Sequence, residues 1–179
     1  PKIANKLRFP GDLIWRKAPF SRWLQSPKDR SREIFKNILI ATDGSDLAEH
    51  AVTNGLSLAK AVGANVSVII VEAPFMFNVP ESRVQMQDAF AKHAEQVRKH
   101  ATSVLNRALA AAKLAGVPCD TIQVENEQPD QAIIAAAKEK VCDLIVLASH
   151  GRSGLSAALL GSVTNKVLTH TNTSVLVCH

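Results

Sequence analysis

The stretch from Cys142 to His170, CDLIVLASHGRSGLSAALLGSVTNKVLTH, decides the fold of this chain. Residues 141–148, which begin one residue before this stretch, are nearly all apolar and are bounded by turn residues. Such a run predicts a central strand of a parallel sheet that is covered on both faces. Gly151 follows this strand almost directly. A glycine there can adopt a positive φ and let backbone amides approach an anion without a Cβ in the way.

The second part of the stretch predicts a helix that begins beside the glycine loop. Nine residues separate Gly151 from Gly161, and Ser162 then precedes the helical pattern of residues 163–168. Ser162 is predicted to be the N-cap, which leaves the free amides of the helix start directed outward, where they attract phosphate. The alternative is that both glycines are only turns and Ser162 is only a cap, because spaced glycines alone are weak evidence.

The rest of the domain alternates short apolar runs with helical periodicity, which is typical of an open parallel α/β sheet. Strands are predicted at residues 37–42, 66–71, 121–124, 141–148 and 174–178. Helices are predicted at residues 46–62, 81–115, 129–140 and 163–168. The chain has room for one domain of about 100 to 150 residues and an appendage.

Three separated segments resemble the universal stress protein family over residues 35–179. They are ILIATDGSDLAEHAV at 38–52, the pattern His150-Gly151-x9-Gly161-Ser162, and SVLVCH at 174–179. The resemblance implies a single flavodoxin-like α/β domain with an open five-stranded parallel sheet in the order 3-2-1-4-5 and helices on both faces. In such a sheet the ligand crevice forms where the strand order reverses, here between the first and fourth strands. The loops at 41–44 and 149–152 are expected to meet there.

The resemblance also implies a site for ATP or another adenine nucleotide, in a regulatory role. The base and ribose are assigned to residues that follow the first two strands, and the phosphates to the glycine loop and the next helix start. The residues assigned to the base and ribose are Ala41, Thr42, Asp43 and Val71. Those assigned to the ribose and phosphates are Gly151, Gly161, Ser162, Val163 and Thr164, and the loop neighbours Ala148, His150 and Arg152 complete the set.

One position departs from the family pattern. Nucleotide-binding members usually have a glycine where this chain has Ala148. An alanine at positive φ costs about 1 kcal/mol and its methyl group crowds the ribose, whereas an alanine in the β region is tolerated. Ala148 therefore leaves open the alternative of a dimeric interaction module that binds no nucleotide.

Catalytic chemistry is not predicted. Residues 149–153 do not form a G-x-S-x-G loop, and no acid is placed to orient the histidine. The chain lacks G-x-x-x-x-G-K-[ST], so any ATP turnover is expected to be slow and incidental. His93 and His100 lie two helical turns apart, too far to share a metal ion without further ligands, so a solvated helix face is expected there. Asp43 is a candidate to hold Mg²⁺ with the nucleotide, although an aspartate there more often accepts hydrogen bonds from a ribose or caps the helix near Asp46.

Residues 1–34 are predicted to form a basic arm outside the folded domain at 35–179. Residues 1–36 hold ten basic and three acidic residues, a balance of +7, while the remainder carries −2. The mildly acidic domain has no obvious electrostatic footprint for nucleic acid. Basic residues interleaved with Trp15 and Trp23 suit an anionic membrane surface or a partner's groove, and the alternative is that these aromatics pack on the protein itself or on a dimer mate.

Localisation and assembly follow from three further features. The odd number of cysteines without a CxxC pair fits a reducing cytoplasm, and no run reaches the roughly 18 apolar residues that a membrane helix needs. The chain begins without Met, so we expect a processed chain or a piece of a longer one, which leaves the cytosolic domain of a membrane transporter as an alternative.

Residues 174–178 are apolar and would form a sheet edge, so we expect a homodimer through this strand, as the resemblance implies.

Overall fold

The computed structural model describes residues 34–74, 83–151 and 160–179, apart from the side chains of residues 83–90. The expectations for the basic arm and its partners, and for Arg152, lie outside these residues. The elements in chain order are β1 (Asn37–Ala41), α1 (Asp46–Val62), β2 (Asn65–Glu72), α2 (Arg83–Ala115), β3 (Cys119–Glu125), α3 (Pro129–Glu139), β4 (Leu144–Ala148), α4 (Ser162–His170) and β5 (Ser174–Cys178).

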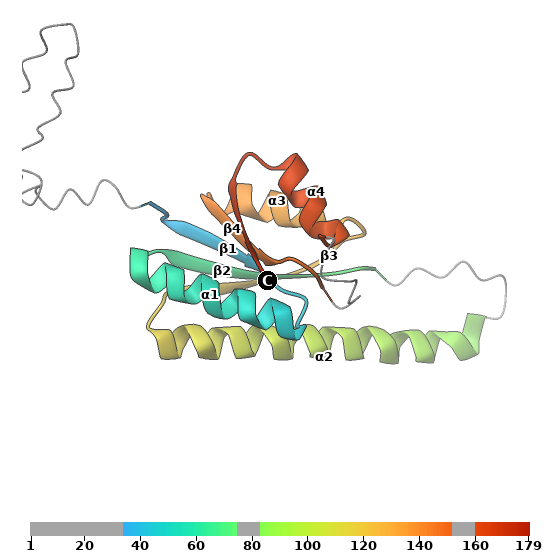
Figure 1. The fold of residues 1–179 in the computed structure, drawn as a ribbon. Helices are drawn as coiled ribbons and strands as arrows, with labels where there is room; N and C mark the ends of the chain where they lie inside the picture. The colour runs from blue at the N-terminus through green and yellow to red at the C-terminus, as the bar shows by residue number, and fades with distance from the viewer. Residues whose placement is uncertain (1–33, 75–82, 152–159) are drawn as a thin grey trace, which may run out of the picture. The chain divides into compact units, whose positions relative to one another are not determined.

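The five strands form one parallel sheet in the order β3-β2-β1-β4-β5, which confirms the predicted fold class and strand order. In Figure 1, α1 and α2 lie on one face of the sheet, and α3 and α4 lie on the other. The central strands are buried on both faces, as their continuous apolar sequences require. In β1, for example, Ile38, Leu39 and Ile40 are all fully buried.

Alternate residues of each strand feed two separate hydrophobic clusters. Ile40 and Val146 pack on the side of α1 and α2. Leu39 and Ile145 pack on the other side, with Ile133 of α3 and the rest of that cluster. Because side chains alternate along a strand, this assignment also fixes which face each residue at the ends of β1, β2 and β4 belongs to.

Helix α1 shows how local sequence sets the elements around the site. Ser45 is its N-cap, and the Ser45 hydroxyl accepts a hydrogen bond from the Ala48 amide at 3.3 Å. Gly63 ends the helix at a left-handed φ of 76° and donates its amide to the Ala59 carbonyl at 2.8 Å. Both ends of α1 fall at the predicted residues, because a serine N-cap and a glycine C-cap are strong signals.

The fourth strand begins at Leu144, so the predicted start at residue 141 was wrong. Val141 instead adopts a left-handed φ of 51° and is exposed. The Asp143 carboxylate then accepts hydrogen bonds from the backbone amides of Lys36 at 2.8 Å and Asn37 at 3.3 Å. Val141 is apolar like the strand residues that follow it, so the sequence does not show that it lies in a turn. This turn connects the end of α3 to β4, and Asp143 bonds it to the start of β1.

The other element ends differ from the prediction by at most two residues, which is within the ordinary uncertainty of such boundaries. Helix α2 is the longest element described, and among its described side chains, those of residues 91–115, the buried ones begin at Ala101. Among the described helices, none is both long and apolar enough to cross a lipid bilayer.

Candidate functional site

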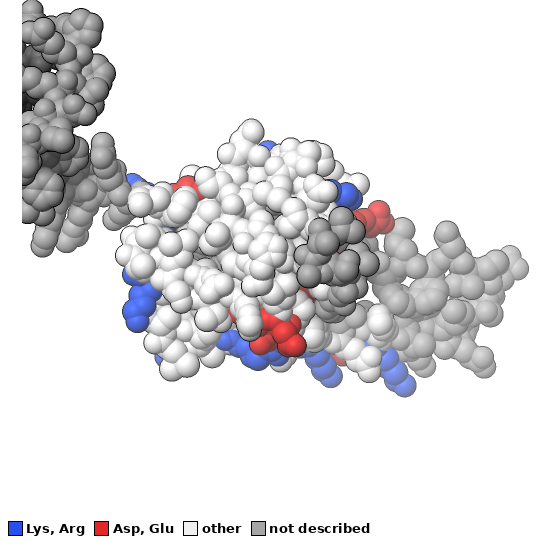
Figure 2. Space-filling model, viewed as in Figure 1, with Lys and Arg blue, Asp and Glu red and all other residues white. Residues whose placement is uncertain are grey.

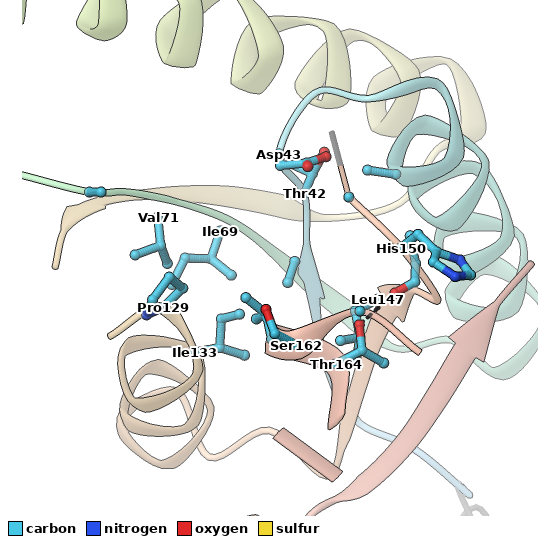
Figure 3. Close-up of a pocket in the computed structure, with 17 residues that line it drawn as sticks. Thr42, Asp43, Ile69, Val71, Pro129, Ile133, Leu147, His150, Ser162 and Thr164 are labelled. Atoms are coloured by element: carbon cyan, nitrogen blue, oxygen red, sulfur yellow. Dashed lines mark hydrogen bonds between the residues drawn. The ribbon is translucent and has the colours of Figure 1, made fainter. Parts of the chain in front are cut away.

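A cavity of about 390 Å³ opens at the carboxyl ends of β1, β2 and β4 (Figure 3). Its lining comes from these strand ends, from the loops after β1 and β4, and from the first turns of α3 and α4. This is the place where the strand order reverses, since β2 and β4 flank β1. Every predicted site residue within the described ranges lines it: Ala41, Thr42, Asp43, Val71, Ala148, His150, Gly151, Gly161, Ser162, Val163 and Thr164.

One part of the cavity is apolar. Ile69 and Val71 of β2, Leu147 of β4 and Ile133 of α3 line it, and we refer to these four residues as the apolar slot. All four belong to the hydrophobic cluster on the side of α3 and α4, or pack against it. Figure 3 shows Ile69, Val71 and Ile133 close together beside Pro129. A slot of this kind accepts a flat apolar face, such as that of an aromatic ring.

Asp43 is the one carboxylate among the described lining residues, and hydrogen bonds hold its side chain in place. Its Oδ1 atom accepts hydrogen bonds from the Ser45 backbone amide at 3.0 Å and from the Ser45 hydroxyl at 2.7 Å. The Ser45 hydroxyl in turn caps α1. Asp43 therefore braces the N-cap residue rather than capping the helix itself, while its carboxylate stays at the cavity.

The loop after β4 is closed at its neck by backbone contacts. The Gly161 amide donates to the Ser149 carbonyl at 2.7 Å, which joins the two ends of the loop. The Thr164 hydroxyl donates to the Ala148 carbonyl at 2.8 Å, which ties the first turn of α4 to the end of β4. These two bonds position the start of α4 at the cavity.

Ser162 is not the N-cap of α4, so that prediction was wrong. Gly161 occupies the N-cap position, and Ser162 is the first helical residue. The strand-to-helix connection needs the backbone of Gly161 against Ser149, and this shifts the helix start by one residue. Because Gly161 has no side chain to cap the helix, the first-turn amides of α4 receive no cap from it.

The two loop glycines are required by close contacts and not by backbone conformation. Neither has a φ in the left-handed region, so the positive φ considered for Gly151 is not adopted. A Cβ at Gly151 would lie 2.6 Å from Oδ2 of Asp43, and a Cβ at Gly161 would lie 3.2 Å from the Ser149 carbonyl oxygen. A side chain at position 151 would displace the Asp43 carboxylate, and a side chain at position 161 would press against the Ser149 carbonyl oxygen.

Ala148 lies at the end of β4 in ordinary strand conformation. It pairs with Cys178 of β5, and its φ is not positive. Its side chain is buried in the cluster on the side of α1 and α2. The backbone cost considered for this alanine therefore does not arise.

His150 lines the cavity, but in Figure 3 its ring points away from the other lining side chains. Its Nδ1 atom lies 3.0 Å from the Ser149 hydroxyl oxygen. Its Nε2 atom is buried and has no hydrogen-bond partner among the described residues. The sequence could not predict this orientation, because it depends on the direction in which the loop leaves β4.

Comparison with known proteins identifies the family. The model of the universal stress protein family matches residues 34–179. The chain belongs to this family. The universal stress protein YxiE of Bacillus subtilis is 34% identical over 147 residues, which cover 80% of this chain and 99% of that protein.

Solved structures of the family have the same fold. A universal stress protein in complex with cAMP is 26% identical, with a TM-score of 0.59, over 81% of this chain and 97% of that one. The universal stress protein of Archaeoglobus fulgidus in complex with dAMP has a TM-score of 0.53 at 20% identity, over 82% of this chain and 99% of that one, and this likeness concerns the fold alone.

Several lining residues of this universal stress protein were not predicted. They are Ile69, Ala73, Pro129, Ile133, Leu147 and Ala48. An apolar residue of the slot looks like any core residue in sequence. The signal that could have found one of them is the strand period of two, since Ile69 lies two residues before the predicted Val71 and on the same face.

Other reactive groups lie outside the cavity. Within the described residues no group of three potential metal ligands is found. Burial raises the pKa of the Cys119 thiol to about 11, with a further contribution from Asp120, and it raises the pKa of the Cys142 thiol to about 11. These thiols are protonated at neutral pH, and so they are poor nucleophiles.

Proposed function

We propose that this universal stress protein binds ATP or another adenine nucleotide in the cavity, and that it acts as a regulatory protein rather than an enzyme. One observation supports the proposal most strongly. A single cavity combines an apolar slot, a carboxylate held by its neighbours, and the uncapped first turn of α4. The apolar slot suits a base, the carboxylate suits the hydroxyls of a ribose, and the helix start suits a phosphate.

The base is assigned to the apolar slot. β1 pairs with β2 only as far as Ala41 opposite Ile69, followed by a bond from the Thr42 amide to the Ile69 carbonyl at 2.9 Å. Val71, two residues beyond Ile69, directs its amide and carbonyl to the same side, where β1 has already turned away. The Val71 amide and carbonyl therefore give the slot one donor and one acceptor side by side. This pair matches the edge of adenine, where N1 accepts and the N6 amino group donates.

The ribose is assigned to Asp43 and the phosphates to the start of α4. A carboxylate accepts hydrogen bonds from ribose hydroxyls, and Asp43 is already oriented by Ser45. The first-turn amides of α4, which receive no side-chain cap from Gly161, favour an anion together with the helix dipole. Mg²⁺ would be held mainly by phosphates and water, because Asp43 is the one carboxylate among the described lining residues.

The likeness to a universal stress protein solved with cAMP also supports an adenine ligand. The described lining residues also support a regulatory role. The His150 ring points away from the cavity, and no described lysine or arginine lines it to stabilise a transferring phosphoryl group. Three free cysteines also suit the reducing cytoplasm as the place of action.

Calorimetry with AMP, ADP, ATP and GTP tests this function, together with mass spectrometry of any ligand released from the denatured protein. We expect saturable binding of at least one adenine nucleotide and much weaker binding of GTP. Absence of binding by every adenine nucleotide at millimolar concentration would favour the alternative, an interaction module without nucleotide.

We further propose that the protein is a homodimer through β5. This strand pairs with β4 on one side only and ends the sheet. Leu176 in β5 and Leu168 in α4 are exposed. Figure 2 shows that the face on which the C-terminus lies is largely uncharged, with charged residues gathered toward its margin. Pairing with a second copy would give the backbone groups of the β5 edge hydrogen-bond partners and cover these leucines. Light scattering at micromolar concentration tests this proposal, and a monomer would contradict it.

A further inference from the structure

Gly151 occupies a position that other residues could adopt by their backbone alone, because its φ is outside the left-handed region. The surroundings nevertheless leave no room for a side chain. A Cβ at this position would lie 2.6 Å from Oδ2 and 3.6 Å from Cγ of Asp43. The first of these distances is shorter than real Cβ contacts allow, so an alanine forces the carboxylate to move.

The Asp43 carboxylate cannot move without breaking other bonds. Its Oδ1 atom holds both the amide and the hydroxyl of Ser45, at 3.0 and 2.7 Å. The same hydroxyl accepts from the Ala48 amide at 3.3 Å as the cap of α1. A rotation of the carboxylate that relieves the contact at position 151 therefore disturbs the Ser45 bonds and the helix cap.

We propose that Gly151 is a positioning residue for the Asp43 carboxylate. The absence of a side chain at position 151 lets Asp43 brace Ser45 and face the cavity at the same time. One consequence of this proposal rests on the proposed function: the size of residue 151 tunes the affinity for the ribose of the nucleotide. The mechanical link between Gly151 and Asp43 holds without any ligand.

A double-mutant cycle in the full chain without nucleotide tests the link. The four proteins are the natural chain, Gly151→Ala, Asp43→Ala and the double variant. We expect Gly151→Ala to lower the thermal unfolding midpoint by about 2–4 °C in the natural background, and by less than half as much when Asp43 is already alanine. An equal loss in both backgrounds would overturn the proposal, because contacting residues couple and independent ones add.

Gly161→Ala is the matched control. Gly161 also lines the cavity with a φ outside the left-handed region, but its Cβ would meet the Ser149 carbonyl oxygen at 3.2 Å instead of Asp43. Its effect on the midpoint should therefore be the same in both Asp43 backgrounds. If Gly161→Ala shows the same coupling to Asp43 as Gly151→Ala, the effect is general to the loop, and the specific role of Gly151 is overturned.

Calorimetry with ATP on the same four proteins measures the consequence for binding. Gly151→Ala should weaken affinity about tenfold in the natural background, because the displaced Asp43 carboxylate loses a charged hydrogen bond from the ribose, and less than twofold when Asp43 is alanine. An equal loss in both backgrounds would overturn the effect on binding. If the natural chain binds no adenine nucleotide, the proposed function fails, while the unfolding cycle still decides the role of Gly151.

Discussion

Replacing Gly161 with valine tests whether the start of α4 holds the phosphates. The Gly161 amide bonds to the Ser149 carbonyl at 2.7 Å, and a Cβ here would lie 3.2 Å from that oxygen and 3.5 Å from Cα of His150. These are backbone atoms that cannot rotate away, and valine adds two methyl groups to the Cβ. We expect the neck of the loop to open and adenine-nucleotide affinity to fall at least tenfold, about 1.4 kcal/mol.

The same change also affects stability, because a hydrogen bond contributes about 0.5–1.5 kcal/mol, equivalent to roughly 1–6 °C in the unfolding midpoint. Gly116→Ala is a control with a similar loss of stability. Gly116 has a φ of 73° and lies outside the cavity lining. An alanine at this φ lowers the free energy of unfolding by about 1–2 kcal/mol. It should lower the midpoint and leave affinity unchanged. Calorimetry on folded Gly161→Val that shows the natural affinity would refute the assignment of the phosphates to this loop.

Four further predictions concern other parts of the molecule. Asp43→Ala should weaken nucleotide binding by about 1.5–3 kcal/mol, the value of a hydrogen bond to a charged group, and an unaltered dissociation constant would contradict the ribose assignment. Val141→Gly should raise the free energy of unfolding by about 1 kcal/mol, because it relieves a left-handed β-branched residue, and a lower or unchanged unfolding midpoint would show that the turn is not strained. Leu176→Lys should convert the proposed dimer to a monomer in light scattering, since a charge on the edge strand opposes pairing, and a dimer that persists would exclude β5 as the interface. Deleting residues 1–32 should leave nucleotide affinity and the unfolding midpoint unchanged but abolish binding to anionic vesicles at low salt; a large loss of stability, with no vesicle binding by the full chain, would show that the arm is structural.

Most of the fold could be predicted because several local signals agree. The apolar runs of β1 and β4 read as strands buried on both faces, and the two caps of α1 mark its ends to the residue. The strand order came from the family resemblance, since periodicity says which segments are strands but not which strands are neighbours. Val141 was assigned wrongly because a valine carries no sign of the left-handed turn that the exit from α3 requires.

The polar half of the site could be predicted better than the apolar half. Asp43 and Gly151 follow strands and are unusual there, so they attract attention in the sequence. Ile133 and Leu147 look like core residues, and only the packing of α3 over β2 and β1, beside the end of β4, makes them cavity walls.

Two further features depend on three-dimensional contacts that propensity does not report. Ser162 has a strong preference for the N-cap, but the bond between the Gly161 amide and the Ser149 carbonyl takes precedence and moves the helix start. The reason for the two glycines also lies in tertiary contacts, with Asp43 at one and with the Ser149 carbonyl at the other.

The most direct test of nucleotide binding is a titration of the ¹⁵N-labelled full chain with ATP, followed by amide chemical shifts. We expect the amides of Thr42, Val71, Gly151 and Ser162 to shift together with one dissociation constant, because all four residues line the cavity or its slot. The amide of Gly116, in the connection between α2 and β3, should not move. Shifts confined to residues outside the cavity, or no shifts at millimolar ATP, would contradict the account.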